Sequence, residues 1–106
     1  MVEHALGVAF GLWRPIVVVH GGCRTGADAI ADGWARRAGV EVEVWPADWA
    51  AYGRAAGPIR NGRMVAAGAR MCLAFPLPGS RGTVNCMELA ESAGIPVQRF
   101  KPGVQR

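Results

Sequence analysis

Two glycine-bearing turns limit what this chain can fold into more than any other feature. HGGCRTGAD spans residues 20–28 and PLPGSRGT spans residues 76–83, and each follows a short apolar run and opens an amphipathic stretch. A strand that enters a helix through a glycine turn is the repeating unit of parallel α/β sheets. Glycine allows backbone conformations closed to other residues, and the first turn of a helix leaves its N–H groups unpaired. We therefore expect an α/β fold with two anion-binding turns.

The length and composition of the chain indicate one folded domain. A chain of 106 residues has the size of a single domain and buries roughly two-thirds of its unfolded surface. Hydrophobic residues make up 51% and charged residues 19%, which is typical of a chain that forms a core. No repeat, low-complexity segment or linker divides the chain, so we expect one domain over residues 1–106.

The charge of the chain favours small anionic ligands over duplex nucleic acid. The net charge is +4, but the basic residues are dispersed along the sequence. A duplex-binding surface more often has a concentrated basic stripe, so a small phosphorylated ligand is the better first hypothesis and nucleic acid the weaker one.

The cysteine and histidine content argues against a zinc site and for a reducing compartment. The three cysteines form no CxxC pair, and the odd count leaves at least one unpaired: Cys23, Cys72 and Cys86. The only histidines are His4 and His20, so we expect no metal and no cofactor. Residues 1–13 have no cationic start, and nowhere do 18 apolar residues run together, so we expect a cytoplasmic protein without membrane contact.

Apolar periodicity predicts alternating helices and strands. Helical spacing or helix-start signals mark four segments: 2–13, 27–38, 58–69 and one from the second glycine turn to Gly94. β-branched or alternating runs predict four strands: 16–20, 41–45, 71–75 and 97–100. Residues 46–58 read as a functional loop with a helical turn around Trp49.

This alternation predicts a Rossmann-like, three-layer α/β/α fold with a mostly parallel, four-stranded sheet. With the strand order second, first, third, fourth, the chain direction switches between the first and third strands. Ligands in open α/β sheets bind at such a switch point, where both glycine turns would then lie together.

The first turn has two interpretations. In the functional one, the backbone amides near Gly21, Gly22, Thr25 and Gly26 hold a phosphate, while Asp28 meets a sugar hydroxyl or fixes the loop. In the structural one, the glycines only make a tight turn, Thr25 caps the following helix, and Asp28 complements the helix dipole.

The second turn has the same two interpretations, and one residue favours function. Phosphate would be held by Gly79, Ser80, Arg81, Gly82 and Thr83. The alternative is a solvated arginine at a helix start, where a positive charge is mildly unfavourable. That penalty favours a functional role for Arg81.

Further polar and aromatic residues lie between the two turns. We expect Arg60 and Asn61 in a first helical turn, as a phosphate clamp and a reader of base or sugar, or else as a surface arginine and an Asx-type cap. Trp45, Trp49 and Tyr52 are candidates for stacking on a base, although packing is the commoner role for such residues.

His20 and Cys23 are three residues apart, but the sequence shows no third group that would orient a nucleophile pair. We expect His20 to be a hydrogen-bonded polar residue at the end of a buried strand, and Cys72 and Cys86 to be small core residues.

Taken together, four motifs resemble the SLOG superfamily, in particular its short YspA-like members. In sequence order they are HGGCRTGAD, WPADW, AAGPIRNGRM and FPLPGSRGT, within about His20 to Val97. That superfamily includes the DNA-processing Smf proteins and the LOG-type nucleotide phosphoribohydrolases. The resemblance implies a Rossmann-like domain that binds nucleotides or nucleotide-derived signals.

The chain departs from the LOG enzymes at the residues that their activity would need. PGSRGT resembles their PGGxGT motif, with Ser80 replacing the second glycine, and Arg60 matches the arginine of their RxxxM segment. Where the resemblance implies a glutamate, this chain has Asn85 and Cys86, and Glu88 follows about one turn later. Glycosidic hydrolysis needs a carboxylate near the reacting sugar, so Arg60 and Glu88 are only weak catalytic candidates.

A second departure concerns the sheet. The resemblance implies a strand before the first helix, and the chain begins at that helix, so either the sheet has four strands or a partner chain completes it. We therefore expect a homo-oligomeric module that binds or senses a nucleotide-derived small molecule. The alternatives are a nucleotide N-glycosidase and a single-stranded DNA-binding protein that uses the arginines and Trp49.

Overall fold

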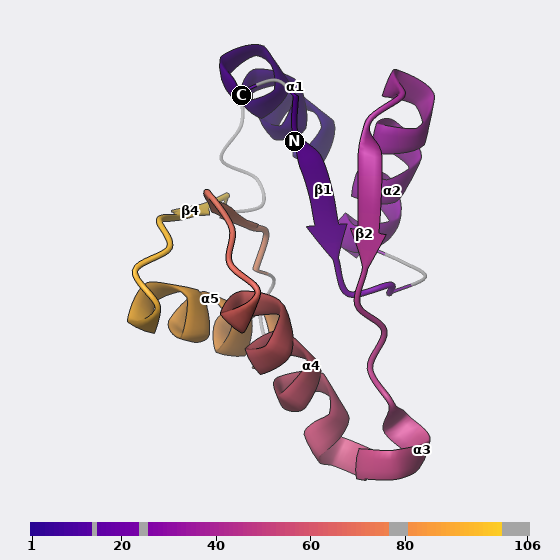
Figure 1. The fold of residues 1–106 in the computed structure, drawn as a ribbon, viewed down its shortest axis with the longest axis vertical. Coiled ribbons are helices and arrows are strands. Elements are labelled where there is room, and N and C mark those ends of the chain that lie inside the picture. Colours follow the sequence, from indigo (N-terminus) through magenta and orange to yellow (C-terminus); the bar gives the residue numbers. More distant parts are fainter. Residues whose placement is uncertain (14, 24–25, 77–80, 101–106) are drawn as a thin grey trace. The chain divides into compact units, whose positions relative to one another are not determined.

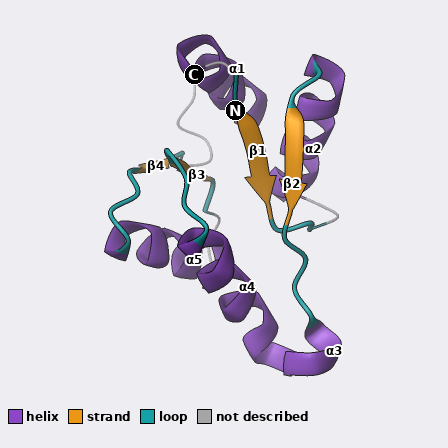
Figure 2. Ribbon diagram, in the orientation of Figure 1, coloured by secondary structure: helices purple, strands orange, loops and turns teal. Residues whose placement is uncertain are grey.

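Helices and short parallel strands alternate along the chain, as Figures 1 and 2 show. The computed structural model describes residues 1–13, 15–23, 26–76 and 81–100. The helices are α1 Val2–Trp13, α2 Gly26–Ala38, α3 Trp49–Tyr52, α4 Ala56–Ala66 and α5 Arg81–Ser92, with a 3₁₀ turn at Gly53–Ala55. The strands are β1 Val17–His20, β2 Glu41–Val44, β3 Cys72–Ala74 and β4 Val97–Arg99. The predicted α/β class is confirmed.

The chain comprises two compact units, Met1–Pro46 and Ala47–Arg106, and each is described by itself. The single domain expected over residues 1–106 stays a prediction. None of the described helices is long and apolar enough to cross a lipid bilayer.

The first unit is built around the parallel pair of β1 and β2. Val17 lies opposite Glu41 and His20 opposite Val44, and the Trp45 N–H donates to the His20 carbonyl at 2.8 Å. Helix α2 makes the crossover between the strands and packs against both of them. It ends, as predicted, before Gly39, whose φ of 71° is in the left-handed region that glycine tolerates.

Helix α1 packs against α2 and completes the core of the first unit. The rings of Phe10 and Trp34 meet edge to face with centroids 6.1 Å apart, and Arg37 forms an ion pair with Glu3. Apolar burial in this unit falls on both helices, on β1 and on the residue before β2: Val2, Ala5, Leu6, Val18, Ala35 and Val40. The helical spacing predicted for residues 2–13 thus gives α1 its buried face.

The second unit contains the parallel pair of β3 and β4, joined by α5. Cys72 lies opposite Val97, and the Phe100 N–H donates to the Ala74 carbonyl at 2.9 Å. The rings of Phe75 and Phe100 stack just beyond this pair, with centroids 4.8 Å apart. Helix α5 begins at Arg81, within the second glycine turn, so the turn opens a helix as predicted.

Helix α4 differs from the prediction at both ends. It begins at Ala56 and ends at Ala66, whereas the sequence predicts residues 58–69. Pro58 still lies in the first turn, where its missing N–H costs nothing, so it does not have to be the first residue. The helix follows α3 and the 3₁₀ turn directly, and the Asp48 carboxylate caps α3 by accepting the Ala51 N–H at 3.0 Å. The helical turn expected around Trp49 is confirmed.

The described strands form two sheets of two strands each. The β1–β2 and β3–β4 pairs are both neighbours in the predicted strand order, and both are parallel, as predicted. A β1–β3 pair is not found among the described residues, so the single four-stranded sheet stays a prediction.

Candidate functional site

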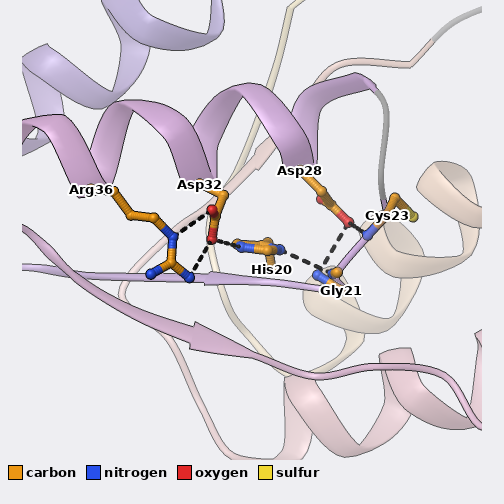
Figure 3. A network of polar contacts seen from close by, with 7 residues as sticks. His20, Gly21, Cys23, Asp28, Asp32 and Arg36 are labelled. Atoms are coloured by element: carbon orange, nitrogen blue, oxygen red, sulfur yellow. Dashed lines mark hydrogen bonds and ion pairs between the residues drawn. The ribbon is translucent and has the colours of Figure 1, made fainter.

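A polar network lies at the carboxyl end of β1, where the first glycine turn begins (Figure 3). Residues Asp28, Asp32 and Arg36 of α2 are spaced by four, so they share one helix face. Figure 3 shows this face turned toward His20 and the turn. His20 is buried, with 8% of its surface exposed, and its Nε2 lies 2.9 Å from Oδ1 of Asp32.

The hydrogen bonds of His20 define its tautomer in the neutral form. The Gly22 N–H donates to Nδ1 at 3.0 Å, so Nδ1 carries no proton. Nε2 then carries the proton and donates it to Asp32. Both ring nitrogens are thus hydrogen-bonded, which confirms that His20 is a satisfied polar residue at a strand end.

Asp32 also accepts a two-point contact from Arg36. The Arg36 Nε lies 2.7 Å from Oδ2 and its Nη2 lies 3.2 Å from Oδ1. The hydrogen bonds from Arg36, and next the one from His20, lower the pKa of Asp32 to about 2. The carboxylate that accepts the hydrogen bond from His20 is therefore ionised at neutral pH.

Asp28 holds the first glycine turn from inside. The N–H groups of Gly21 and Cys23 both donate to Oδ2 of Asp28, each at 3.2 Å (Figure 3). Gly22 and Gly26 have positive φ values of 80° and 74°, which explains why the turn needs glycine at these positions. Of the three roles that the sequence suggests for Asp28, these contacts are those of a residue that fixes the loop. Binding of a sugar hydroxyl stays a prediction, and Thr25 lies outside the described residues.

The second turn is described only where α5 begins. Residues 77–80, including Gly79 and Ser80, lie outside the described residues. Arg81 and Gly82 are exposed in the first turn of α5, and Thr83 is half-buried beside them.

Asn61 links α4 to the start of α5. It is buried, with 4% of its surface exposed, and its Nδ2 donates to the Gly82 carbonyl at 3.2 Å and to Asn85 Oδ1 at 3.0 Å. Its Oδ1 accepts the Arg60 Nε at 2.7 Å. The structure thus brings three of the predicted site residues together within the second unit.

The expected position of Arg60 and Asn61 in a first helical turn is wrong. Because α4 begins at Ala56, both residues lie in its second turn, and the residue that precedes the helix is Ala55. Asn61 is therefore not an Asx-type cap. Its amide instead makes contacts between two helices. Glu88, the weak catalytic candidate, is exposed on α5.

The aromatic candidates lie in both units. Trp45 Nε1 donates to Glu43 at 2.7 Å in the first unit. In the second, Trp49 and Tyr52 are 60% and 43% exposed on α3. The Arg63 guanidinium lies over the Tyr52 ring, 5.6 Å from its centroid.

Sequence reasoning missed Asp32, Arg36 and Asn85. Asp32 and Arg36 follow Asp28 on α2 at a spacing of four, so the three side chains share one helix face. This spacing is the signal from which a contact between that face and His20, at the end of β1, could have been predicted. Asp32 is the orienting carboxylate that the sequence did not reveal. It binds Nε2 of His20, and the Gly22 amide binds Nδ1, so both ring nitrogens have partners other than Cys23.

Two further cysteines lie in or near the elements of the second unit. Cys72 and Cys86 are half-buried, and a hydrogen bond to Cys86 together with burial raises the pKa of the Cys72 thiol. Within the described ranges, no group of three histidine, cysteine or acidic side chains is arranged to hold a metal ion.

Two comparisons with known proteins find similarity, one over the first half of the chain and one over most of its length. The sequence pattern of the YspA, cpYpsA-related SLOG family matches residues 1–52, which include α1, the first glycine turn and α2. The chain is 56% identical over 90 residues to the Gene 61 protein of Mycobacterium phage D29, an alignment that covers 80% of this chain and 71% of that protein. No solved structure matches. On these similarities, the chain belongs to the YspA, cpYpsA-related SLOG family.

Proposed function

We propose that the chain binds a nucleotide-derived, phosphate-containing ligand in a pocket to which both glycine turns contribute. Membership of the SLOG family is consistent with a nucleotide-related function in general. The observation that carries the proposal is the Asn61 link, which holds Arg60 beside the first turn of α5.

This link gathers groups suited to phosphate at one place in the second unit. Arg81 and Gly82 are exposed at the start of α5, where the unpaired N–H groups of a helix supply donors and positive potential. Arg60 adds a second guanidinium, and Thr83 adds a hydroxyl. We assign the phosphate to these residues together with Gly79 and Ser80.

The proposed pocket also requires one sheet in the order β2-β1-β3-β4. Each described two-stranded sheet leaves strand edges open to further pairing. These open edges are consistent with a continuous sheet, which would have the two turns at its carboxyl edge.

Calorimetric titration with AMP, ADP-ribose, NAD and cyclic nucleotides tests the proposal. We expect at least one of them to bind, and Arg81→Ala to weaken that binding roughly tenfold or more, since it removes a charge-assisted hydrogen bond. Arg54→Ala is the matched control, because Arg54 is an exposed arginine of the 3₁₀ turn. The proposal fails if no nucleotide produces heat, or if the two arginine variants weaken binding equally.

Single-stranded DNA binding is a second candidate, and the exposure of Trp49 is the observation that favours it. A base could stack on this ring while arginines contact the backbone. Binding of a labelled oligonucleotide that weakens steeply with salt and is lost in Trp49→Ala would support this function. If the labelled oligonucleotide does not bind even at low salt, this second candidate function is wrong.

A further inference from the structure

The first glycine turn already contains acceptors for three successive backbone amides. The N–H groups of Gly21 and Cys23 donate to the Asp28 carboxylate, and the Gly22 N–H between them donates to His20. A turn that binds phosphate would direct these same groups at the ligand. Here they are directed at two side chains of the same unit.

The acceptor at this place also carries a charge. Oδ2 of Asp28 accepts two of the three amides, so a carboxylate oxygen lies where a phosphate oxygen would have to bind (Figure 3). An incoming phosphate would have to displace that carboxylate and then remain close to it. Like charges at such distances repel strongly in a partly buried site. Asp32 adds a second negative charge nearby, which Arg36 compensates.

The other carboxylate oxygen of Asp28 has no such partner. Among the described residues, Oδ1 of Asp28 makes no hydrogen bond, and the side chain is only half-buried. A carboxylate oxygen in that position accepts a hydrogen bond from a neutral donor, and a hydroxyl is the donor that a sugar provides.

We propose that Asp28 is a specificity-determining residue, which closes the amides of residues 21–23 to phosphate and offers Oδ1 to a hydroxyl of the ligand. This inference rests on the proposed function and refines it: at the β1 turn the ligand is recognised through a sugar hydroxyl and not through its phosphate. The assignment differs from the expectation that the amides of the first turn hold phosphate.

The first experiment uses inorganic phosphate as the probe and needs no nucleotide. In amide NMR spectra of the wild-type protein, the resonances of Gly21, Gly22 and Cys23 should not move saturably as phosphate is added. In Asp28→Asn and Asp28→Ala these resonances should move saturably with phosphate, because the competing charge of Asp28 is removed. Glu41→Gln is the matched control, since it removes the same charge from an exposed position on β2.

Two results would overturn the anion exclusion. One is saturable movement of these three amides in the wild-type protein. The other is an Asp28→Asn variant with a native-like spectrum in which the Gly21, Gly22 and Cys23 amide resonances show no saturable shift with phosphate. The asparagine variant keeps the size and an acceptor oxygen, so it tests the charge even if Asp28→Ala does not fold.

The second experiment compares AMP with its 2′-deoxy and 3′-deoxy analogues. The wild-type protein should bind at least one deoxy analogue roughly tenfold more weakly than AMP. Asp28→Asn should reduce that discrimination, and Glu41→Gln should leave it unchanged. Equal discrimination in Asp28→Asn and the wild type overturns the sugar contact.

The two experiments separate this inference from the proposed function. If no nucleotide binds the wild type while phosphate behaves as expected at the turn, the proposed function fails and the anion exclusion stands. If AMP binds and its phosphate shifts the amides of the first turn, the proposed function stands and this inference fails.

Discussion

Nε2 of His20 and Oδ1 of Asp32 lie 2.9 Å apart, which joins the last residue of β1 to the second turn of α2. The two residues are 12 positions apart in the sequence, so this bond connects the end of β1 to α2 across the first glycine turn. The same ring accepts the Gly22 N–H. A partly buried contact therefore helps to fix the backbone of the candidate site.

The ionisation of Asp32 should make the stability of the first unit depend on acidic pH. Hydrogen bonds lower the pKa of Asp32 from 3.8 to about 2, so the folded state favours the ionised carboxylate. Its contribution is complete above pH 3.8 and is lost as the pH falls toward about 2. Urea unfolding measured across this range should therefore show a loss of stability that is smaller in Asp32→Asn.

A matched variant shows whether that loss belongs to Asp32. Glu41→Gln removes a carboxylate from an exposed position of the same unit. It should keep the wild-type slope of stability against pH in this range. If Asp32→Asn and the wild type lose stability equally, the network does not depress the Asp32 pKa.

The tautomer of His20 is open to direct measurement. When neutral, its ring should carry the proton on Nε2, because Nδ1 accepts the Gly22 amide proton. Nitrogen NMR shifts distinguish the two ring nitrogens, and the exposed His4 of α1 is an internal control for a solvated ring. A neutral His20 protonated on Nδ1 would contradict the hydrogen-bond assignment.

Local patterns in the sequence predicted the elements well because their causes are local. The spacing of apolar residues from Val2 to Trp13 defines α1, and Gly39 and Gly94 follow α2 and α5 with the positive φ values that helix ends need. The early start of α4 escaped prediction because Pro58 is tolerated throughout a first turn and does not define its first residue.

The site contacts were harder to predict because they depend on which faces meet. The contact of Asp32 with His20 exists only because the polar face of α2 lies toward the end of β1. Asn61 could be recognised as a polar residue near the second turn, but its bond to Gly82 depends on how α4 and α5 pack. Neither relation is encoded in a short motif.

Replacement of Gly22 should destabilise the first unit. Its φ is 80°, and an added Cβ would lie 3.0 Å from Cγ1 of Val44, so Gly22→Ala meets both backbone strain and a close contact. We expect a loss of about 1–2 kcal/mol in the free energy of unfolding. Chemical denaturation measures it.

Another glycine provides the opposite expectation. Gly7 lies within α1, is exposed, and has nothing within 4 Å of an added Cβ. Gly7→Ala should therefore stabilise the protein by roughly 0.5–1 kcal/mol, since alanine is the better helix former. Equal effects of the two substitutions would show that neither the conformation nor the surroundings of Gly22 matter.

The Asn61 link should be one of the larger stability contributions in the second unit. Asn61→Ala leaves the Asn85 side chain without its Asn61 contact and removes the acceptor of Arg60 Nε. A buried polar group left unpaired costs about 1–3 kcal/mol, and we expect a loss of that size in urea unfolding. Glu88→Gln, an exposed change on α5, should have little effect.

A double-mutant cycle isolates the bond between the two helices. If the Nδ2 contact with Asn85 contributes directly, Asn61→Ala and Asn85→Ala together should cost less than the sum of the single losses, by about 0.5 kcal/mol or more. Additive losses would mean that the two side chains act independently.

Because the same link holds Arg60 beside α5, Asn61→Ala should also weaken nucleotide binding, whereas Asn85→Ala, which spares the Arg60 contact, should weaken it less.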